Sequence, residues 1–105
     1  MTIEEIGVDD LALVLADNLI DVRETDEYEE AHVPGAVHVP LGSLTRTDLE
    51  RFRGRRLYVI CKSGGRSFRA CEYLASEGYD AVNVAGGTMA WIASGHPVHG
   101  GPSPS

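Results

Sequence analysis

One stretch of the chain carries residue types that could do covalent chemistry at a sulfur atom. Cys61 follows the apolar run 57–60 and precedes a turn with Gly64 and Gly65 that leads into a helical segment from Ser67. In such an arrangement, backbone N–H groups of the turn converge on the sulfur and the positive end of the helix points at it. Both effects favour the charged thiolate, so the pattern predicts a thiol of low pKa that is nucleophilic at neutral pH.

The turn after Cys61 supplies the candidate residues for binding an anionic substrate. Lys62, the only lysine of the chain, either attracts the anion or points into solvent, and we favour the first. Arg66 either faces the substrate or braces the turn by pairing with Asp21 or Glu24. The predicted binding residues are Lys62, Ser63, Gly64, Gly65, Arg66 and Ser67.

Other side chains around this turn have a choice of roles. Ser63 and Ser67 could donate hydrogen bonds to the sulfur, although for Ser67 capping of the helix is the preferred role. The two glycines allow backbone conformations that residues with a Cβ resist. Asp21 and Arg23 follow another apolar run, and we expect them to form a structural ion pair that supports the turn.

The composition is that of one ordinary globular domain. The chain has 105 residues, of which 43% are hydrophobic and 24% charged, enough for a single core. A net charge of −7 argues against nucleic acid as a partner. No apolar run approaches the roughly 20 residues that span a membrane, and the acidic N-terminus does not resemble a signal peptide. We therefore expect a cytoplasmic protein, in a reducing setting that suits a reactive thiol.

The charges are unevenly distributed along the chain. Residues 1–30 hold eleven acidic side chains and one basic one, whereas residues 46–69 hold eight of the nine Lys and Arg residues and two acids. The basic part contains the cysteine turn and could attract small anions or dock an acidic partner. The alternative, which we favour for the arginines of residues 46–56, is a solvated helix face.

Alternating short strands and helices predict a single α/β domain over residues 1–98. The predicted strands are 19–22, 37–39, 57–60 and 81–84, with residues 2–6 either a strand or a helix start; the predicted helices are 8–16, 24–30, 43–52, 67–77 and 86–92. This order favours a parallel sheet of about five strands with helices on both faces. The active site of such a sheet lies at the carboxyl ends of the strands, where Cys61 and Asp21 fall. Residues 99–105 are predicted to be a disordered tail.

Four pieces of the sequence also stand in an order typical of a known family. They run from Leu19 to Ala36, from Cys61 to Ser67, from Ser67 to Gly78, and from Gly86 through Trp91 to Val98. Together they resemble the rhodanese family of single-domain sulfurtransferases, over nearly all of residues 3–98. One departure is Ala31, where the family usually has glycine, and it lies away from the cysteine turn.

The resemblance implies transfer of sulfane sulfur through a persulfide on Cys61. The thiolate would attack the outer sulfur of thiosulfate or another persulfide donor, and sulfite would leave. A thiophilic acceptor, either cyanide or a thiol on a small molecule or a protein, would then take the sulfur. Backbone N–H groups from Lys62 to Ser67 would stabilise the terminal sulfur anion, and no cofactor is implied.

Three alternatives to a free-standing sulfurtransferase remain. The first is a persulfide carrier for a partner protein, and the second is a non-catalytic interaction module, which the complete turn around Cys61 disfavours. The third is a phosphatase of the related dual-specificity type, in which arginine follows cysteine by six residues. Arg66 follows Cys61 by five, so the loop is one residue short of that pattern, which disfavours a phosphatase.

The second cysteine and the histidines carry weaker signals. Cys71 falls on the apolar face of its helix, so it is predicted to be a buried hydrophobic residue rather than a resolving cysteine. The histidines are scattered without the spacing of metal ligands, and we predict no metal: they are His32, His38, His96 and His99.

Overall fold

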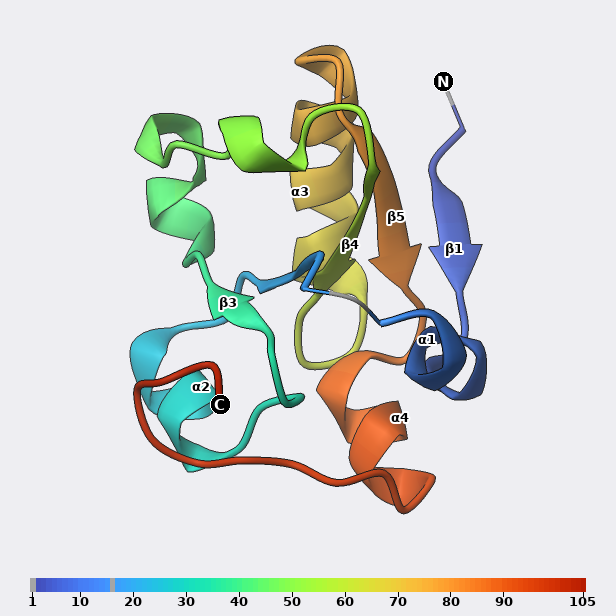
Figure 1. Cartoon of the computed structure of the whole chain (residues 1–105), viewed down its shortest axis with the longest axis vertical. Coiled ribbons are helices and arrows are strands. Elements are labelled where there is room, and N and C mark those ends of the chain that lie inside the picture. Colours follow the sequence, from blue (N-terminus) through green and yellow to red (C-terminus); the bar gives the residue numbers. More distant parts are fainter. Residues whose placement is uncertain (1, 16) are drawn as a thin grey trace.

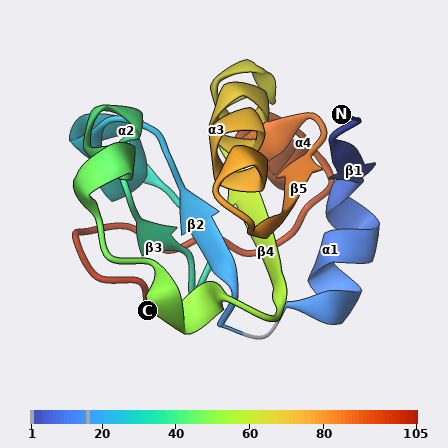
Figure 2. The same ribbon diagram turned by 90° about the horizontal axis from the view of Figure 1, so that it is seen from above.

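A sheet of parallel strands organises the molecule, in a computed structural model that describes residues 2–15 and 17–105 (Figure 1). The strands are β1 (Glu4–Ile6), β2 (Leu19–Asp21), β3 (Val37–His38), β4 (Arg56–Ile60) and β5 (Asp80–Val84). Their order in the sheet is β1-β5-β4-β2-β3, which can be followed from right to left in Figure 2. All neighbouring strands are parallel. The predicted parallel sheet is confirmed, and residues 2–6 contain its edge strand.

Helices cover both faces of the sheet. One face carries α3 (Gly65–Ser76) with two short 3-10 helices, η1 (Leu41–Arg46) and η2 (Glu50–Phe52); the other carries α1 (Val8–Val14), α2 (Thr25–Glu30) and α4 (Gly87–Ala93). Side chains of β4 alternate between the two cores, because successive residues of a strand point to opposite faces. Leu57, Val59 and Cys61 join the core under α3, whereas Tyr58 and Ile60 join the opposite one.

The end of α1 and the start of α3 each differ from the sequence prediction by two residues. Helix α1 ends at Val14, and Ala16 of the predicted helix 8–16 lies outside the described residues, as does Met1 of the predicted domain. Helix α3 begins at Gly65, two residues before the predicted start at Ser67.

Among the described residues, no helix combines the length and the apolar character that crossing a membrane requires.

The segment 43–52, predicted as one helix, forms parts of two separate 3-10 helices. Its apolar positions are buried, as their spacing indicates: Leu44, Leu49 and Phe52. Between η1 and η2, the hydroxyl of Thr47 donates to the carbonyl of Ser43, and the carboxylate of Asp48 accepts the backbone N–H of Glu50. These side chains compete with the backbone for hydrogen bonds, which interrupts a continuous helix.

Residues 99–105, which we expected to be a disordered tail, pack instead beside α2, where the chain ends in Figure 1. His32 and His99 exchange both backbone hydrogen bonds, at 2.8 and 2.9 Å. Near the end of the tail, the N–H of Gly35 donates to the carbonyl of Pro104 at 2.7 Å. Backbone groups make these bonds, so the polar composition of the tail gives no sign of them.

Candidate active site

Cys61 follows the carboxyl end of β4 and is almost completely buried, with 1% of its surface exposed. The backbone N–H of Gly64 donates to its Sγ at 3.1 Å, and the hydroxyl oxygen of Ser67 lies 3.2 Å from the same atom. Behind the sulfur, the backbone N–H of Thr88 donates to the carbonyl of Cys61 at 2.9 Å. The first turn of α4 therefore holds the cysteine backbone, while residues 64–67 surround the sulfur.

Opposing effects act on the pKa of the Cys61 thiol. Burial raises this pKa, because a thiolate is poorly solvated in the protein interior. Hydrogen bonds from the Ser67 hydroxyl and from the backbone N–H groups of Ser67, Gly64 and Ser63 lower it, and together they outweigh burial. The pKa of Cys61 therefore lies below the ordinary value for cysteine, which favours a nucleophilic thiolate.

Gly64 and Gly65 have different roles, although their sequence context suggested the same one. The φ angle of Gly64 is +113°, in the left-handed region that favours glycine, and Gly64 caps the start of α3. Gly65 is the first residue of α3, and a Cβ on it would meet no atom within 4 Å. Only Gly64 therefore needs to be glycine for its backbone conformation.

Ser67 does not cap helix α3, contrary to the prediction. The helix begins two residues earlier, so Ser67 lies inside the first turn. Its hydroxyl points toward the sulfur of Cys61 and lies 2.5 Å from Oδ1 of Asn83. The early helix start thus places a hydroxyl group beside the candidate reacting atom.

Arg66 braces the turn, but through a carboxylate that we did not predict. Its Nη1 and Nη2 donate to the two carboxylate oxygens of Glu27 at 2.7 and 2.9 Å, rather than to Asp21 or Glu24. Glu27 also accepts the backbone N–H of Glu24 at the start of α2. The hydrogen bond from Arg66 holds the pKa of Glu27 at about 2, against the opposing effect of burial.

Glu27→Gln should lower the stability of the protein at neutral pH but not in acid. The pKa of Glu27 falls from 4.5 to about 2 on folding, so the ion pair contributes stability above pH 4.5 that is lost as the pH falls toward 2. Because both side chains are partly exposed, we expect a loss of about 1 kcal/mol or less near pH 7.

Urea unfolding of both proteins at neutral pH and near pH 2 would measure this difference. Glutamine keeps an oxygen that accepts the N–H of Glu24, so the substitution spares the start of α2. An equal loss at both pH values would show that the ion pair does not contribute in this way.

Asp21 and Arg23 form an ion pair at the end of β2. The Nη2 and Nε atoms of Arg23 donate to the carboxylate of Asp21 at 2.8 and 3.0 Å, and both side chains are buried. Nη2 also donates to the carbonyl of Ala31 at 2.7 Å. The pair thus ties β2 to the end of α2, and α2 in turn reaches the cysteine turn through the ion pair of Glu27 and Arg66.

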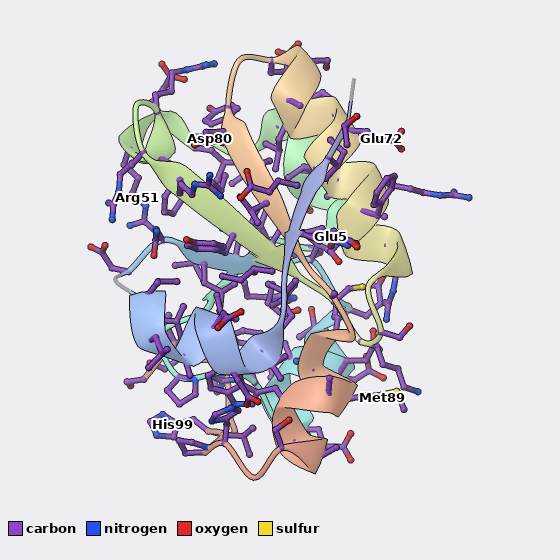
Figure 3. The ribbon with its side chains drawn as sticks, turned by 90° about the vertical axis from the view of Figure 1, so that its right-hand side faces the viewer. Glu5, Arg51, Glu72, Asp80, Met89 and His99 are labelled. Atoms are coloured by element: carbon purple, nitrogen blue, oxygen red, sulfur yellow. The ribbon has the colours of Figure 1, made fainter. Side chains whose placement is uncertain are left out.

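A cavity of about 360 Å³ opens beside the cysteine turn. Lys62, Arg23 and Glu30 supply charged groups to its lining, while Met89 and Ile92 of α4 supply apolar surface. Figure 3 shows Met89 projecting outward from α4. Lys62 is exposed, and it forms no ion pair with any residue that the structure describes. Its ammonium group is therefore available to an anion that enters the cavity.

Cys71 lies in the core under α3 and is completely buried. Burial raises the pKa of this thiol to about 12, so it is protonated at neutral pH. This favours the interpretation of Cys71 as a core residue over that of a resolving cysteine.

Within the described part of the chain, no three His, Cys, Asp or Glu side chains are grouped so that they could hold a metal ion.

The arginines of residues 46–56 lie away from the cysteine turn. Arg56 begins β4 and Cys61 follows its last residue, and a rise of roughly 3.3 Å per residue separates their backbones by about 16 Å. Three of these arginines have acidic partners: Arg53 with Glu50, Arg55 with Asp17, and Arg56 with Glu4 and Asp80. These positions favour the solvated, locally paired role over attraction of anions to Cys61.

Two residues connected to the sulfur through Ser67 were not singled out from the sequence. Asn83 of β5 is 1% exposed, and its Nδ2 donates to the carboxylate of Glu5 at 2.7 Å. The two residues are register partners across β1 and β5, and Figure 3 shows Glu5 on the edge strand beside α3. The available signal was an amide inside the apolar run 81–84, because a buried amide requires hydrogen-bond partners.

Comparison with known proteins identifies the family. The model of the rhodanese-like domain matches residues 7–94. The chain belongs to the rhodanese-like domain family. Among solved structures, a rhodanese-related protein from Thermoplasma volcanium is 32% identical with a TM-score of 0.82, and the match covers 90% of this chain and 96% of that one.

Two curated relatives of this rhodanese-like domain are named for sulfur chemistry. A protein of Allochromatium vinosum named sulfurtransferase is 34% identical over 101 residues, which cover 91% of this chain and 94% of that protein. Bacillus subtilis YrkF, provisionally named a sulfur carrier protein, is 43% identical over 75 residues. That match covers 70% of this chain but 40% of YrkF, so the chain spans less than half of that relative.

Proposed function

We propose that the protein is a sulfurtransferase that carries sulfane sulfur on Cys61. The thiolate attacks the outer sulfur of an anionic donor such as thiosulfate, forming a new S–S bond. The bond between the two donor sulfurs breaks, and sulfite leaves with its electron pair. An acceptor thiolate, or cyanide in an assay, then attacks the terminal sulfur and regenerates the Cys61 thiolate.

The observation that carries this proposal is the set of hydrogen bonds around Sγ of Cys61. The N–H of Gly64 and the hydroxyl of Ser67 stabilise negative charge on a sulfur that is buried yet has a lowered pKa. Such a sulfur is a nucleophile without a separate general base. A reducing compartment such as the cytoplasm would keep it in the reactive thiol form.

Intact mass of the protein before and after thiosulfate, without reductant, tests the proposal. We expect a gain of one sulfur atom that cyanide reverses. A mass that stays unchanged with thiosulfate and with a second sulfane donor, such as a small organic persulfide, would contradict sulfur transfer by this chain.

Lys62→Ala should weaken the use of an anionic donor. The Lys62 ammonium lines the cavity and has no ion-pair partner among the described residues. Its positive charge is therefore not neutralised by a neighbouring carboxylate and can attract thiosulfate. We expect KM for thiosulfate to rise by about 3- to 10-fold with kcat changed by less than about 2-fold. Steady-state kinetics at low salt would measure both, and Lys62→Arg should recover most of the loss. An unchanged KM would exclude this role of Lys62.

A second candidate is a persulfide carrier whose donor and acceptor are proteins. The observation in its favour is the cavity, where the half-exposed Met89 and Ile92 of α4 flank charged groups and could contact a partner surface. YrkF, to which the chain is similar, is provisionally named a sulfur carrier protein. Slow loading by thiosulfate together with fast loading by a persulfide-bearing protein would favour the carrier over the thiosulfate enzyme.

A further inference from the structure

A chain of hydrogen bonds leads from the surface of the edge strand to the sulfur of Cys61. The carboxylate of Glu5 accepts from Nδ2 of Asn83 at 2.7 Å, and Oδ1 of Asn83 lies 2.5 Å from the hydroxyl oxygen of Ser67. That hydroxyl oxygen is 3.2 Å from Sγ of Cys61. Asn83, Ser67 and Cys61 are all buried, so water does not replace these contacts freely.

The neighbours of Asn83 determine which way its amide group points. Its Nδ2 faces two groups that can only accept, the carboxylate of Glu5 and the carbonyl of Gly64, the latter at 3.2 Å. A reversed amide would turn its oxygen toward both acceptors and lose both hydrogen bonds. Oδ1 is therefore held toward Ser67, where it acts as an acceptor.

Ser67 has one hydroxyl hydrogen, and two groups compete for it. If the hydrogen points to Oδ1 of Asn83, it cannot also stabilise a negative charge on Cys61. The third acceptor within reach, the carbonyl of Gly64, already accepts the N–H of Phe68 at 3.1 Å. We propose that Asn83, oriented by Glu5, is a positioning residue that competes with Sγ of Cys61 for the hydroxyl hydrogen of Ser67.

This competition changes with the charge on the sulfur. A protonated Cys61 leaves the Ser67 hydrogen on Asn83, whereas a thiolate draws the hydrogen to itself and leaves Oδ1 without its donor. In a persulfide, the negative charge moves to the terminal sulfur and Sγ becomes a neutral bridging atom. The Ser67 hydrogen then returns to Asn83, so the same amide favours the sulfur-loaded state over the thiolate. This last step rests on the proposed function, while the competition for the hydrogen does not.

Other charged and titratable groups lie beside the Cys61 thiol or interact with its neighbours, and they must stay constant in a test. Lys62 follows Cys61 in the turn, Arg66 and Cys71 of α3 interact electrostatically with Cys61, and Glu5 of β1 acts on Cys71. Changing Asn83 and Ser67 leaves all of them in place. Removing the Asn83 amide does not leave its other two partners without hydrogen bonds. The carbonyl of Gly64 still accepts the N–H of Phe68, and Glu5 is exposed to water.

The test is a double-mutant cycle on the pKa of Cys61, read from the pH dependence of its alkylation by iodoacetamide. Cys61→Ser provides the blank. We expect Asn83→Leu to lower the pKa by about 0.5 to 1 unit and Ser67→Ala to raise it by a similar amount. The double variant should match Ser67→Ala within about 0.3 unit, because Asn83 acts only through the Ser67 hydroxyl.

Each result of this cycle decides the proposal. A pKa that rises or stays constant in Asn83→Leu would overturn it, and so would an equal fall in the Ser67→Ala background, which would indicate a general electrostatic effect. If circular dichroism shows that Asn83→Leu is unfolded, Asn83→Val removes the same oxygen with a side chain that suits the strand. Alkylation does not require sulfur transfer, so failure to load sulfur would refute the proposed function and leave this readout intact.

Discussion

Replacing Cys61 with serine should abolish sulfur loading while leaving the fold intact. The serine hydroxyl is not ionised at neutral pH and does not attack sulfane sulfur, so the rate should fall by roughly 10³-fold or more. The N–H of Gly64, which donates to Sγ, can donate to the serine oxygen instead. We therefore expect the free energy of unfolding to change by about 1 kcal/mol or less.

The matched control is Cys71→Ala, because Cys71 is the other cysteine of the chain and is buried under α3. This variant should lose stability, since it leaves a small cavity, but it should still gain one sulfur atom with thiosulfate. Mass spectrometry of both variants together with urea unfolding separates the two effects. Sulfur loading that persists in Cys61→Ser would contradict the assignment of Cys61 as the reacting thiol. So would loss of loading in a folded Cys71→Ala protein.

Gly87→Ala should destabilise the protein by about 2–4 kcal/mol and displace the cysteine turn. The φ angle of Gly87 is +59°, and an alanine Cβ would lie 2.5 Å from the carbonyl oxygens of both Cys61 and Lys62. These atoms belong to the backbone and accept the N–H groups of Thr88 and Met89. They cannot move away without breaking the hydrogen bonds that join α4 to Cys61 and Lys62.

Gly65→Ala is the control for this effect, since it adds the same methyl group within the cysteine turn. An alanine Cβ at Gly65 would have open space around it, and Gly65 has no left-handed backbone conformation. The free energy of unfolding of the Gly65→Ala variant should equal that of the wild type or exceed it by up to about 1 kcal/mol. Urea unfolding of the two variants would measure the contrast, and a Gly87→Ala protein within about 0.5 kcal/mol of the wild type would refute the steric argument.

The cysteine turn could be predicted because its signals are local. An apolar strand, a cysteine and two glycines stand within a few residues of one another, and the alternation of strands and helices placed Cys61 at a carboxyl end of the sheet. The partner of Arg66 could not be predicted in the same way. The acidic run 24–30 offers several carboxylates of equal character, and only the rotation of α2 decides that Glu27 reaches the turn, 39 residues away in sequence.

The other differences arise from a misplaced helix start, a long-range strand pairing and side-chain hydrogen bonds. Two added residues at the start of α3 convert Ser67 from a predicted cap into a neighbour of the sulfur. The role of Asn83 depends on a strand pairing between residues 78 positions apart, β1 with β5, which no local pattern reports. In segment 43–52, the spacing of the apolar residues predicted the buried positions. It did not predict the hydrogen bonds of the Thr47 and Asp48 side chains, which interrupt the helix.

The central position of β4 has a consequence for amide hydrogen exchange. β4 is bonded to β5 on one side and β2 on the other, and its residues 57–60 are buried. Their amides should exchange with solvent only when the whole domain opens, whereas the two-residue edge strand β3 should exchange through local opening. The sulfur of Cys61 is therefore attached to the segment that we expect to exchange most slowly. Any motion that brings a donor or acceptor to it has to arise in the turn after Cys61 or in the partner molecule.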